Sequence, residues 1–318
     1  MSVVFHMTRG IPSRGQVGEP PRSDESGGLS FHVSGPTRVL GPDGRALNIG
    51  PRRQRELLTL LLLRPGVAVP VERLAEELWN GRPPPGARST LHAYLSGLRR
   101  VLEPGRRAPY RLLTTRDDSY ALEVPAESLD VARLCALTDA GRAAGVVGAY
   151  ERADELLGEA RLLWRGEPFA ELADHDVAES ERARLVEEYT SLREEAAEYR
   201  LAMGAHASAI GDLMSLVRAH PLRERPRAQL VLALYRSGRQ AEALQVLEAG
   251  RRLCAEELGL DPGPRLRDLQ AAILRQDPTL SAPPRPPAPA PICGYRRTRV
   301  AGRAHHPRPH RDSPHRRR

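Results

Sequence analysis

Hydrophobic and polar residues alternate in the first apolar segment of the chain, as they do in half-buried strands. In LSFHV (29–33), Leu29, Phe31 and Val33 alternate with polar neighbours. Two more short runs, TRVL (37–40) and ALNI (46–49), follow between turns rich in Gly, Pro and Asp. The pattern predicts a small antiparallel sheet of short strands.

The hydrophobic period becomes helical from residue 51 onward. RRQRELLTLLLLRPG (52–66) keeps leucines on one face and ends at Pro-Gly, and VPVERLAEELWNG (69–81) ends at Asn-Gly. A third helix is predicted within ARSTLHAYLSGLRRVLEPG (87–105), where leucines at 91, 95, 98 and 102 form one buried stripe.

Two strand-like runs follow the third helix. YRLLTT (110–115) and SYALEV (119–124) flank Arg116-Asp117-Asp118, which predicts a β-hairpin. A small sheet, three helices and a C-terminal hairpin wing make the element order of a winged helix-turn-helix. We therefore expect a winged-helix domain over 29–124.

After residue 124 the spacing of hydrophobic residues is helical almost throughout, so the chain is predicted to be mainly α. Helices are expected over 129–145, 149–166 and 174–203. GAHASAI (204–210) is matched 34 residues later by GRQAEAL (238–244), and this is the tetratricopeptide (TPR) period. Residues 125–280 are expected to form an all-α, TPR-like helical domain.

The two ends of the chain lack the hydrophobic residues that a core needs. Residues 1–28 and the Pro/Arg/His-rich residues 281–318 are predicted to be a disordered leader and tail. The tail is either a basic segment that attracts phosphates or out-of-frame sequence added by a shifted stop in a GC-rich gene, and the sequence leaves both open.

Charge is distributed unevenly over these segments. The chain carries +8 and contains no lysine, so every basic side chain other than histidine is an arginine. Residues 29–124 have 15 arginines against 9 acidic residues, and residues 125–280 have 20 against 27. A basic N-terminal domain joined to an acidic helical domain favours a nucleic-acid partner for the former.

Motifs for catalysis, cofactors and metals are missing. The sequence has no phosphate-binding glycine loop, GxSxG or HExxH, and its three cysteines, Cys135, Cys254 and Cys293, have no metal-ligand spacing. We therefore expect a non-enzyme without cofactor or metal. No apolar run approaches the ~20 residues of a membrane span, and no secretory signal is recognisable. A cytoplasmic protein, associated with the nucleoid, is expected.

The third helix has a face opposite its leucines that suits a DNA groove. At 100° per residue this face carries Ser89, His92, Ala93, Ser96 and Arg100, together with Gly97. Small side chains would let the helix enter a major groove, where arginine and histidine reach bases or phosphates. Arg116 at the hairpin tip could reach a neighbouring backbone. An ordinary surface helix is the alternative.

Several long motifs resemble those of the SARP family, the Streptomyces antibiotic regulatory proteins, which join an OmpR-like winged helix to a bacterial transcriptional activator domain. The motifs are GPRRQRELLTLLLLRPG, VERLAEELW, PPPGARSTLHAYLSGLRRVL, LLWRGEPFAEL, HPLRERPRAQLVLALYRSGRQAEALQVLE and ELGLDPGPRLRDLQAAILRQDP. The resemblance extends from about Leu29 to Pro278. It implies a DNA-binding transcription activator of a secondary-metabolite (antibiotic) gene cluster, which binds direct repeats near promoters, as a homodimer on DNA, and recruits RNA polymerase holoenzyme.

The resemblance also assigns residues. It implies DNA contacts from the third helix and the wing, and a polymerase-facing loop before that helix. The resemblance assigns DNA contacts to Ser96, Arg99, Arg100, Thr114 and Arg116. Together with the residues on or beside the exposed helix face, the predicted DNA-contacting residues are Ser89, Thr90, His92, Ala93, Ser96, Arg99, Arg100, Thr114 and Arg116. The polymerase-contact loop comprises Pro83, Pro84, Pro85 and Arg88.

The chain departs from the family pattern in two places. Gly97 stands where an arginine is common, which removes a DNA contact, and Asp117-Asp118-Ser119 replaces a glycine-rich wing tip. Other interpretations are a nonenzymatic TPR scaffold that binds protein, and a repressor.

Overall fold

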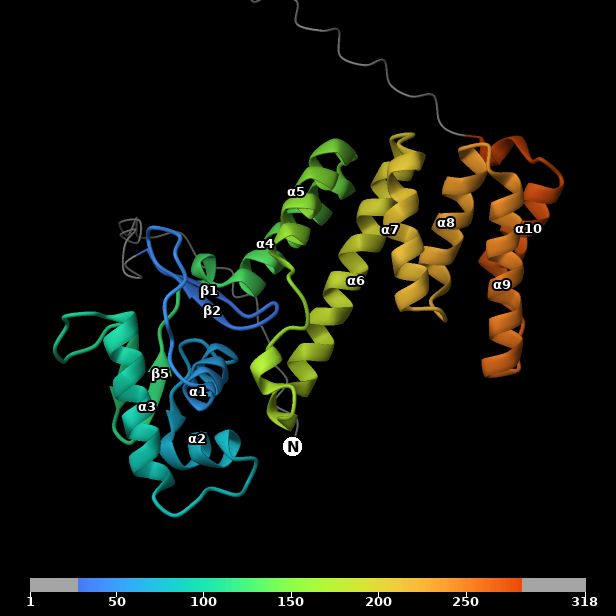
Figure 1. The fold of residues 1–318 in the computed structure, drawn as a ribbon. Helices are drawn as coiled ribbons and strands as arrows, with labels where there is room; N and C mark the ends of the chain where they lie inside the picture. The colour runs from blue at the N-terminus through green and yellow to red at the C-terminus, as the bar shows by residue number, and fades with distance from the viewer. Residues whose placement is uncertain (1–27, 282–318) are drawn as a thin grey trace, which may run out of the picture. The chain divides into compact units, whose positions relative to one another are not determined.

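The computed structural model describes residues 28–281, coloured in Figure 1. Apart from residues 28 and 281, the predicted leader and tail lie outside the described residues. The described part is mainly helical, with two small sheets near its beginning.

The N-terminal part has the elements of a winged helix, and the predicted fold class is confirmed. Two strands form one sheet and three form another, in the order β3-β5-β4. The elements are β1 (Ser30–His32), β2 (Arg38–Leu40), α1 (Arg52–Leu62), β3 (Val69–Pro70), α2 (Val71–Leu78), α3 (Ala87–Leu102), β4 (Leu113–Arg116) and β5 (Ser119–Leu122).

The strands differ in detail from the sequence-based expectation. The run 46–49 makes only a single bridge, between Ala46 and Leu40, rather than a strand. The strand predicted from residue 110 begins at Leu113, because the Glu103 carboxylate accepts the backbone N–H groups of Arg111 and Leu112. The short strand β3 was not predicted, since it has only two residues and one of them is a proline.

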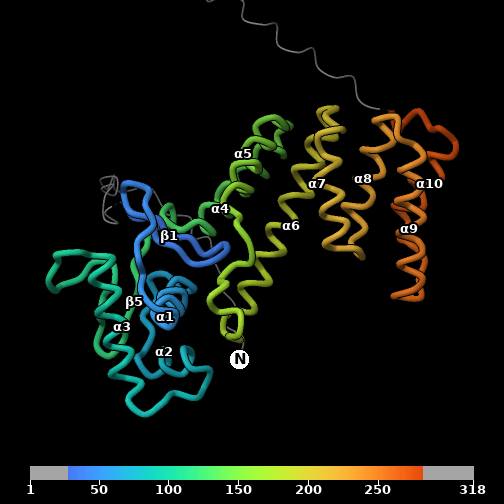
Figure 2. Tube along the Cα trace, in the orientation of Figure 1, coloured from blue at the N-terminus to red at the C-terminus, as the bar shows by residue number. Residues whose placement is uncertain are grey.

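The rest of the described chain consists of helices joined by short connections (Figure 2). The long helix expected from residue 174 begins instead at Glu179, because a 3-10 turn, η3 (Asp176–Ala178), precedes it. The elements are η1 (Ala126–Ser128), α4 (Asp130–Val146), α5 (Tyr150–Leu163), η2 (Ala170–Leu172), η3, α6 (Glu179–Ala202), α7 (His206–Ala219), α8 (Glu224–Arg236), α9 (Gln240–Leu258), α10 (Pro264–Leu274) and η4 (Pro278–Leu280).

The 34-residue repeat corresponds to two similar helix pairs, α6–α7 and α8–α9. The turns before α7 and α9 contain Gly204 and Gly238, whose φ angles of 76° and 77° lie in the left-handed region that glycine adopts without strain. Ala209 and Ala243 occupy equivalent positions in α7 and α9, and both are fully buried. Small side chains at these positions let neighbouring helices approach closely, as the TPR-like pattern predicts.

The first hydrophobic core crosses from the winged helix into the helical part of the chain. It contains residues of β1, α1, α2 and α3 together with Leu129, Phe169, Leu172 and Leu185. A second core lies among α6 to α10, and a smaller one lies among α4, α5 and α6. The winged helix therefore shares its core with the start of the helical part.

Asp130 at the beginning of α4 anchors this junction. Its side chain is almost fully buried and accepts the backbone N–H groups of Val33 at 2.9 Å and Ser34 at 3.0 Å. The backbone N–H of Phe169 donates to the carbonyl oxygen of Val33 at 2.7 Å. The segment after β1 is thus hydrogen-bonded to residues more than 90 positions further along the chain.

Candidate nucleic-acid interface

Helix α3 buries its leucines and exposes most of the face predicted from the sequence. Gly97, which was predicted to lie on that face, is half-buried and faces Gln54 of α1. Leu91, Leu95, Leu98 and Leu102 are 0 to 4% exposed. On the opposite side lies an exposed set that we call the α3 face, made of Ser89, His92, Ala93, Ser96 and Arg100. The other two predicted α3 contacts, Thr90 and Arg99, are half-buried at its margins.

The two adjacent arginines of α3 have different surroundings. Arg99 donates from Nε and Nη2 to the carbonyl oxygen of Leu113 at 3.0 and 2.9 Å, and from Nη2 to Oγ1 of Thr115 at 2.6 Å. Its guanidinium also lies 4.3 Å from the ring centroid of Tyr110. Arg100 is exposed and has no hydrogen bond or ion pair through its side chain to any described residue. Arg99 therefore holds the wing against α3, whereas Arg100 is available to a ligand.

Arg116 is the last residue of β4, next to Thr115, whose hydroxyl accepts a hydrogen bond from Arg99 of α3. Nη2 of Arg116 lies 2.8 Å from Oε1 of Glu123 across the hairpin, and both side chains are partly solvated. Such an exposed ion pair contributes little stability and can be exchanged for a phosphate. Thr114 is half-buried, and its hydroxyl donates to the carbonyl oxygen of Ala121 at 3.4 Å.

Arg88 connects α3 to the wing tip. It lies in the first turn of α3 and not in the preceding loop, and its two terminal nitrogens contact Glu72 of α2 at 2.6 Å and Asp118 at 2.5 Å. One of the two negative charges at the wing tip is therefore neutralised within the protein. The loop residues Pro83, Pro84 and Pro85 are exposed.

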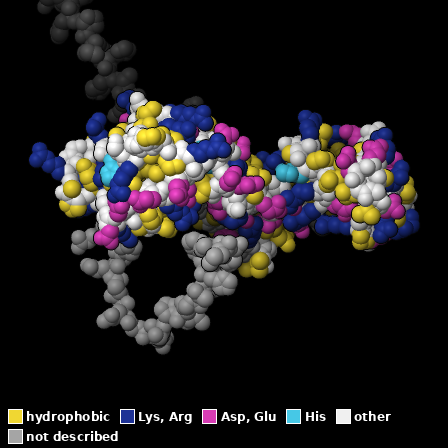
Figure 3. All heavy atoms as spheres, turned by 90° about the horizontal axis from the view of Figure 1, so that it is seen from below, with side chains coloured by type: hydrophobic (Ala, Val, Ile, Leu, Met, Phe, Trp, Pro, Cys, Tyr) yellow, Lys and Arg dark blue, Asp and Glu magenta, His cyan; other side chains and the backbone are white. Residues whose placement is uncertain are grey.

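Positive charge in the winged helix is incompletely neutralised. Within residues 28–281, several arginines of the winged helix have no carboxylate within ion-pair distance. These include Arg82, Arg100, Arg107 and Arg111. On the face shown in Figure 3, basic and acidic side chains are interspersed. The unpaired Arg100, and not the charge of the whole surface, therefore identifies the candidate site.

In the described part of the chain, no group of three His, Cys, Asp or Glu residues is suited to a metal ion. None of its helices has the length and hydropathy needed to cross a membrane.

Comparisons with known proteins identify the family. Residues 45–122 match the family described as transcriptional regulatory protein, C terminal, and residues 129–274 match the bacterial transcriptional activator domain. The chain is 34% identical to the regulatory protein DnrI of Streptomyces peucetius, over 76% of this chain and 92% of DnrI. The chain belongs to the SARP family.

Other SARP relatives are longer than this chain. The regulatory protein AfsR of Streptomyces coelicolor is 43% identical, but the match covers 85% of this chain and only 27% of AfsR. A solved structure of Mycobacterium tuberculosis EmbR, in complex with a low-affinity phosphopeptide, superposes with a TM-score of 0.73 at 34% identity, covering 79% of this chain and 66% of EmbR. The chain thus corresponds to a part of these relatives.

Gln54 is a residue of this SARP winged helix that sequence reasoning did not single out. It is 8% exposed, and its amide nitrogen donates to the carbonyl oxygen of Ile49 at 2.9 Å. A Cβ atom on Gly97 would lie 2.5 Å from its Oε1. A side chain at position 97 would thus displace the buried amide of Gln54, so the packing of α1 against α3 favours glycine here. The sequence gives no signal for this contact, because it depends on how two helices meet.

Glu103 is a second residue that the sequence did not reveal. Its side chain is buried at the end of α3 and accepts backbone N–H groups of Arg111 at 2.9 Å and Leu112 at 3.2 Å. It fixes the chain between α3 and the wing, and so the position of Arg116 relative to Arg100. The only sequence signal is the Glu-Pro-Gly that ends the helix.

Proposed function

We propose that this SARP chain is a sequence-specific DNA-binding transcription activator, with α3 inserted in a major groove and the wing against the adjacent backbone. The observation that carries the proposal is the unpartnered Arg100 on the α3 face, among side chains small enough to enter a groove. Arginine in this position can contact guanine or a phosphate. The residues proposed to contact DNA are Ser89, Thr90, His92, Ala93, Ser96, Arg100, Thr114 and Arg116.

Arg99 has a different role in this proposal. Because its Nε and Nη2 atoms donate to Leu113 and Thr115, Arg99 positions the wing relative to α3 and contacts DNA at most through the two N–H groups of Nη1. Arg99 and Arg100 thus have different proposed roles, although both were predicted from the sequence to contact DNA.

The experiment is DNA-affinity sequencing with the purified chain on host genomic fragments, followed by binding isotherms on the enriched sites. Arg100→Ala is expected to weaken binding at least about tenfold, and Arg116→Ala several-fold, because each removes a charged contact. The slope of log K against log salt should fall by about one for each phosphate contact that is lost.

The matched control is Arg45→Ala, which removes an exposed arginine from the same domain, 3.7 Å from Asp43 and distant in sequence from α3 and the wing. Unchanged affinity in both Arg100→Ala and Arg116→Ala would overturn the assigned face. Enrichment of no DNA at all would overturn the function and favour a protein-binding role for the TPR-like helices.

We further propose the finer features that the family resemblance implies. These are a homodimer on direct repeats beside promoters of a secondary-metabolite cluster, and recruitment of RNA polymerase holoenzyme in the cytoplasm through the exposed Pro83–Pro85 loop. Arg88 is proposed to act in holding this loop and the wing, since its guanidinium contacts Glu72 and Asp118. In this scheme 29–124 binds DNA and 125–280 supports protomer or polymerase contacts. Binding sites placed where they block polymerase would instead indicate a repressor.

A further inference from the structure

Three arginines without a counter-ion lie at the junction between the winged helix and α4. They are Arg38 of β2, Arg133 of α4 and Arg165 in the segment after α5, and we call them the junction arginines. All three side chains are exposed. None of them has an ion pair or a side-chain hydrogen bond to another residue within 28–281.

Two of the junction arginines are placed by backbone hydrogen bonds around the buried His32. Arg38 is the partner of His32 in the antiparallel ladder of β1 and β2, so the two side chains lie on the same face of that sheet. The backbone N–H of Arg165 donates at 2.9 Å to the carbonyl oxygen of Ser34, two residues after His32. Residues 127 positions apart in the sequence are thereby brought to one place.

Arg133 reaches the same place from α4. It lies one helical turn after Asp130, whose carboxylate is 3.7 Å from Nδ1 of His32. Burial lowers the pKa of His32, and the positive charges of all three junction arginines lower it further, while Asp130 opposes them. Because charges act strongly only over short distances, the guanidinium groups gather around His32.

The neighbouring carboxylates leave this positive charge without ion pairs. Asp130 is 2% exposed and accepts the backbone N–H and the hydroxyl of Ser34, so its oxygens are held inside the protein. Glu127 and Glu159 line a hollow together with Arg133, but neither lies within ion-pair distance of it. Like charges that gather without counter-ions repel one another, and a bound anion relieves that repulsion.

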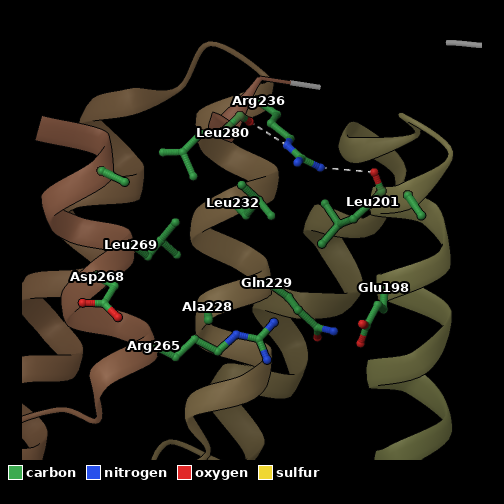
Figure 4. Close-up of a pocket in the computed structure, with 12 residues that line it drawn as sticks. Glu198, Leu201, Ala228, Gln229, Leu232, Arg236, Arg265, Asp268, Leu269 and Leu280 are labelled. Atoms are coloured by element: carbon green, nitrogen blue, oxygen red, sulfur yellow. Dashed lines mark hydrogen bonds between the residues drawn. The ribbon is translucent and has the colours of Figure 1, made fainter. Parts of the chain in front are cut away.

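The groove between α6, α8 and α10 differs from the junction in this respect. Figure 4 shows Arg236 and Arg265 among its lining residues together with Glu198 and Asp268, so guanidinium groups and carboxylates are equal in number there. An excess of positive charge is therefore a property of the junction and not of this groove.

We propose that the junction arginines bind one phosphate dianion, either inorganic phosphate or a phosphomonoester. Guanidinium groups match phosphate oxygens with paired N–H donors, and three of them favour a doubly charged ligand over a carboxylate. Arg38 belongs to the winged helix, whereas Arg133 and Arg165 belong to the helical part. Bound phosphate would therefore connect the two parts and stabilise their junction. The site is separate from α3 and does not depend on the DNA-binding proposal.

The test is titration of inorganic phosphate into the full chain, without DNA, at pH 7.5 and constant ionic strength. We expect the Tm to rise to a plateau, with half of the effect at roughly 0.1 to 5 mM. Glycerol 3-phosphate distinguishes the two sources, because an equal effect identifies a site for phosphomonoesters and no effect identifies a site for the free ion. Dimethyl phosphate, which has the single charge of a DNA backbone phosphate, should bind at least about tenfold more weakly.

A second readout locates the anion at the junction. Bound anion should raise the pKa of His32, since it neutralises the charges that lower it. NMR titration of the imidazole resonances measures this pKa with and without sulfate, which has the same geometry and stays doubly charged across the pH range. The pKa of the exposed His92 in α3 should not change.

Variants test the individual arginines. Arg38→Gln and Arg165→Gln should each weaken phosphate binding at least about fivefold, because each removes a charged donor. Arg218→Gln is the matched control, since Arg218 is exposed on α7 and also has no ion pair in the described part of the chain. It should leave the affinity unchanged. Circular dichroism would establish that all three variants fold.

Two results would overturn the proposal. One is the absence of a saturable rise in Tm up to about 10 mM phosphate, which is too weak for a specific site. The other is a rise that the double variant Arg38→Gln/Arg165→Gln retains, because exclusion of phosphate from the whole protein surface would then explain it. Loss of DNA binding in any variant has no bearing on either result.

Discussion

Single residues decide which groups of the winged helix are free to meet a ligand. Arg99 and Arg100 are neighbours in sequence, but the first is surrounded by the wing and by Tyr110, while the second faces solvent. A hydrogen bond from a charged donor to a backbone carbonyl contributes more than an exposed ion pair. Arg99 therefore stabilises the fold, whereas Arg100 is exposed and free to contact a ligand.

This difference gives a residue-scale prediction. Arg99→Ala should speed amide hydrogen exchange in the wing, residues 113–122, by about tenfold, because the hairpin loses its attachment to α3. Arg100→Ala should leave that exchange unchanged. Hydrogen-exchange mass spectrometry of the free protein measures both, and equal exchange in the two variants would contradict the assignment.

At the scale of elements, the contact between α1 and α3 depends on the absence of a side chain at Gly97. Gln54 fills this space and is fixed by its hydrogen bond to Ile49. Alanine in the middle of a helix normally stabilises it by up to about 1 kcal/mol relative to glycine. Here the gain is opposed by displacement of a buried amide, which costs about 1 to 3 kcal/mol.

Gly97→Ala is therefore predicted to lower the free energy of unfolding by roughly 1 kcal/mol, the difference between these opposing terms. Gly211→Ala, at an exposed position in α7 with no atom within 4 Å of the added Cβ, should instead raise it. Urea denaturation measures both changes. Stabilisation by Gly97→Ala equal to that by Gly211→Ala would show that Gln54 moves aside freely.

The sequence was sufficient for most of the helices and for most of the exposed face of α3, because both follow from the spacing of apolar residues along one helix. It was insufficient where two elements meet. The contacts of Arg99 with the wing, of Gln54 with Gly97 and of Arg88 with Asp118 join residues between 14 and 43 positions apart, and no local pattern records them. Strand ends were also missed, because a buried carboxylate, Glu103, replaced part of the expected ladder.

At the scale of the whole molecule, the junction of the winged helix and α4 contains a buried histidine beside the anchoring carboxylate. His32 Nδ1 lies 3.7 Å from Asp130. Burial, and next the positive charge of Arg165, lower the pKa of His32, while Asp130 opposes this and Arg133 and Arg38 add to it. The unfolded chain therefore takes up a proton at this residue at higher pH than the folded chain.

Stability should accordingly fall as the pH is lowered through about 6.5, the ordinary pKa of histidine. The urea midpoint of the wild-type chain is expected to decrease between pH 7.5 and 5.5, and His32→Gln should make that decrease smaller. His92→Gln, at an exposed position of α3, serves as the matched control. A pH dependence that His32→Gln leaves unaltered would exclude the junction as its source.

The shared core has a consequence for how this protein can be divided. A fragment ending at Val124 would retain Phe31 and Val33 but would lose Leu129, which bridges to Phe31, and Phe169, which hydrogen-bonds to Val33. Its newly uncovered apolar surface would favour aggregation. A truncation intended to isolate the DNA-binding part should therefore end after Leu185. A chimera that contains this part must also include the segment from α4 to the start of α6.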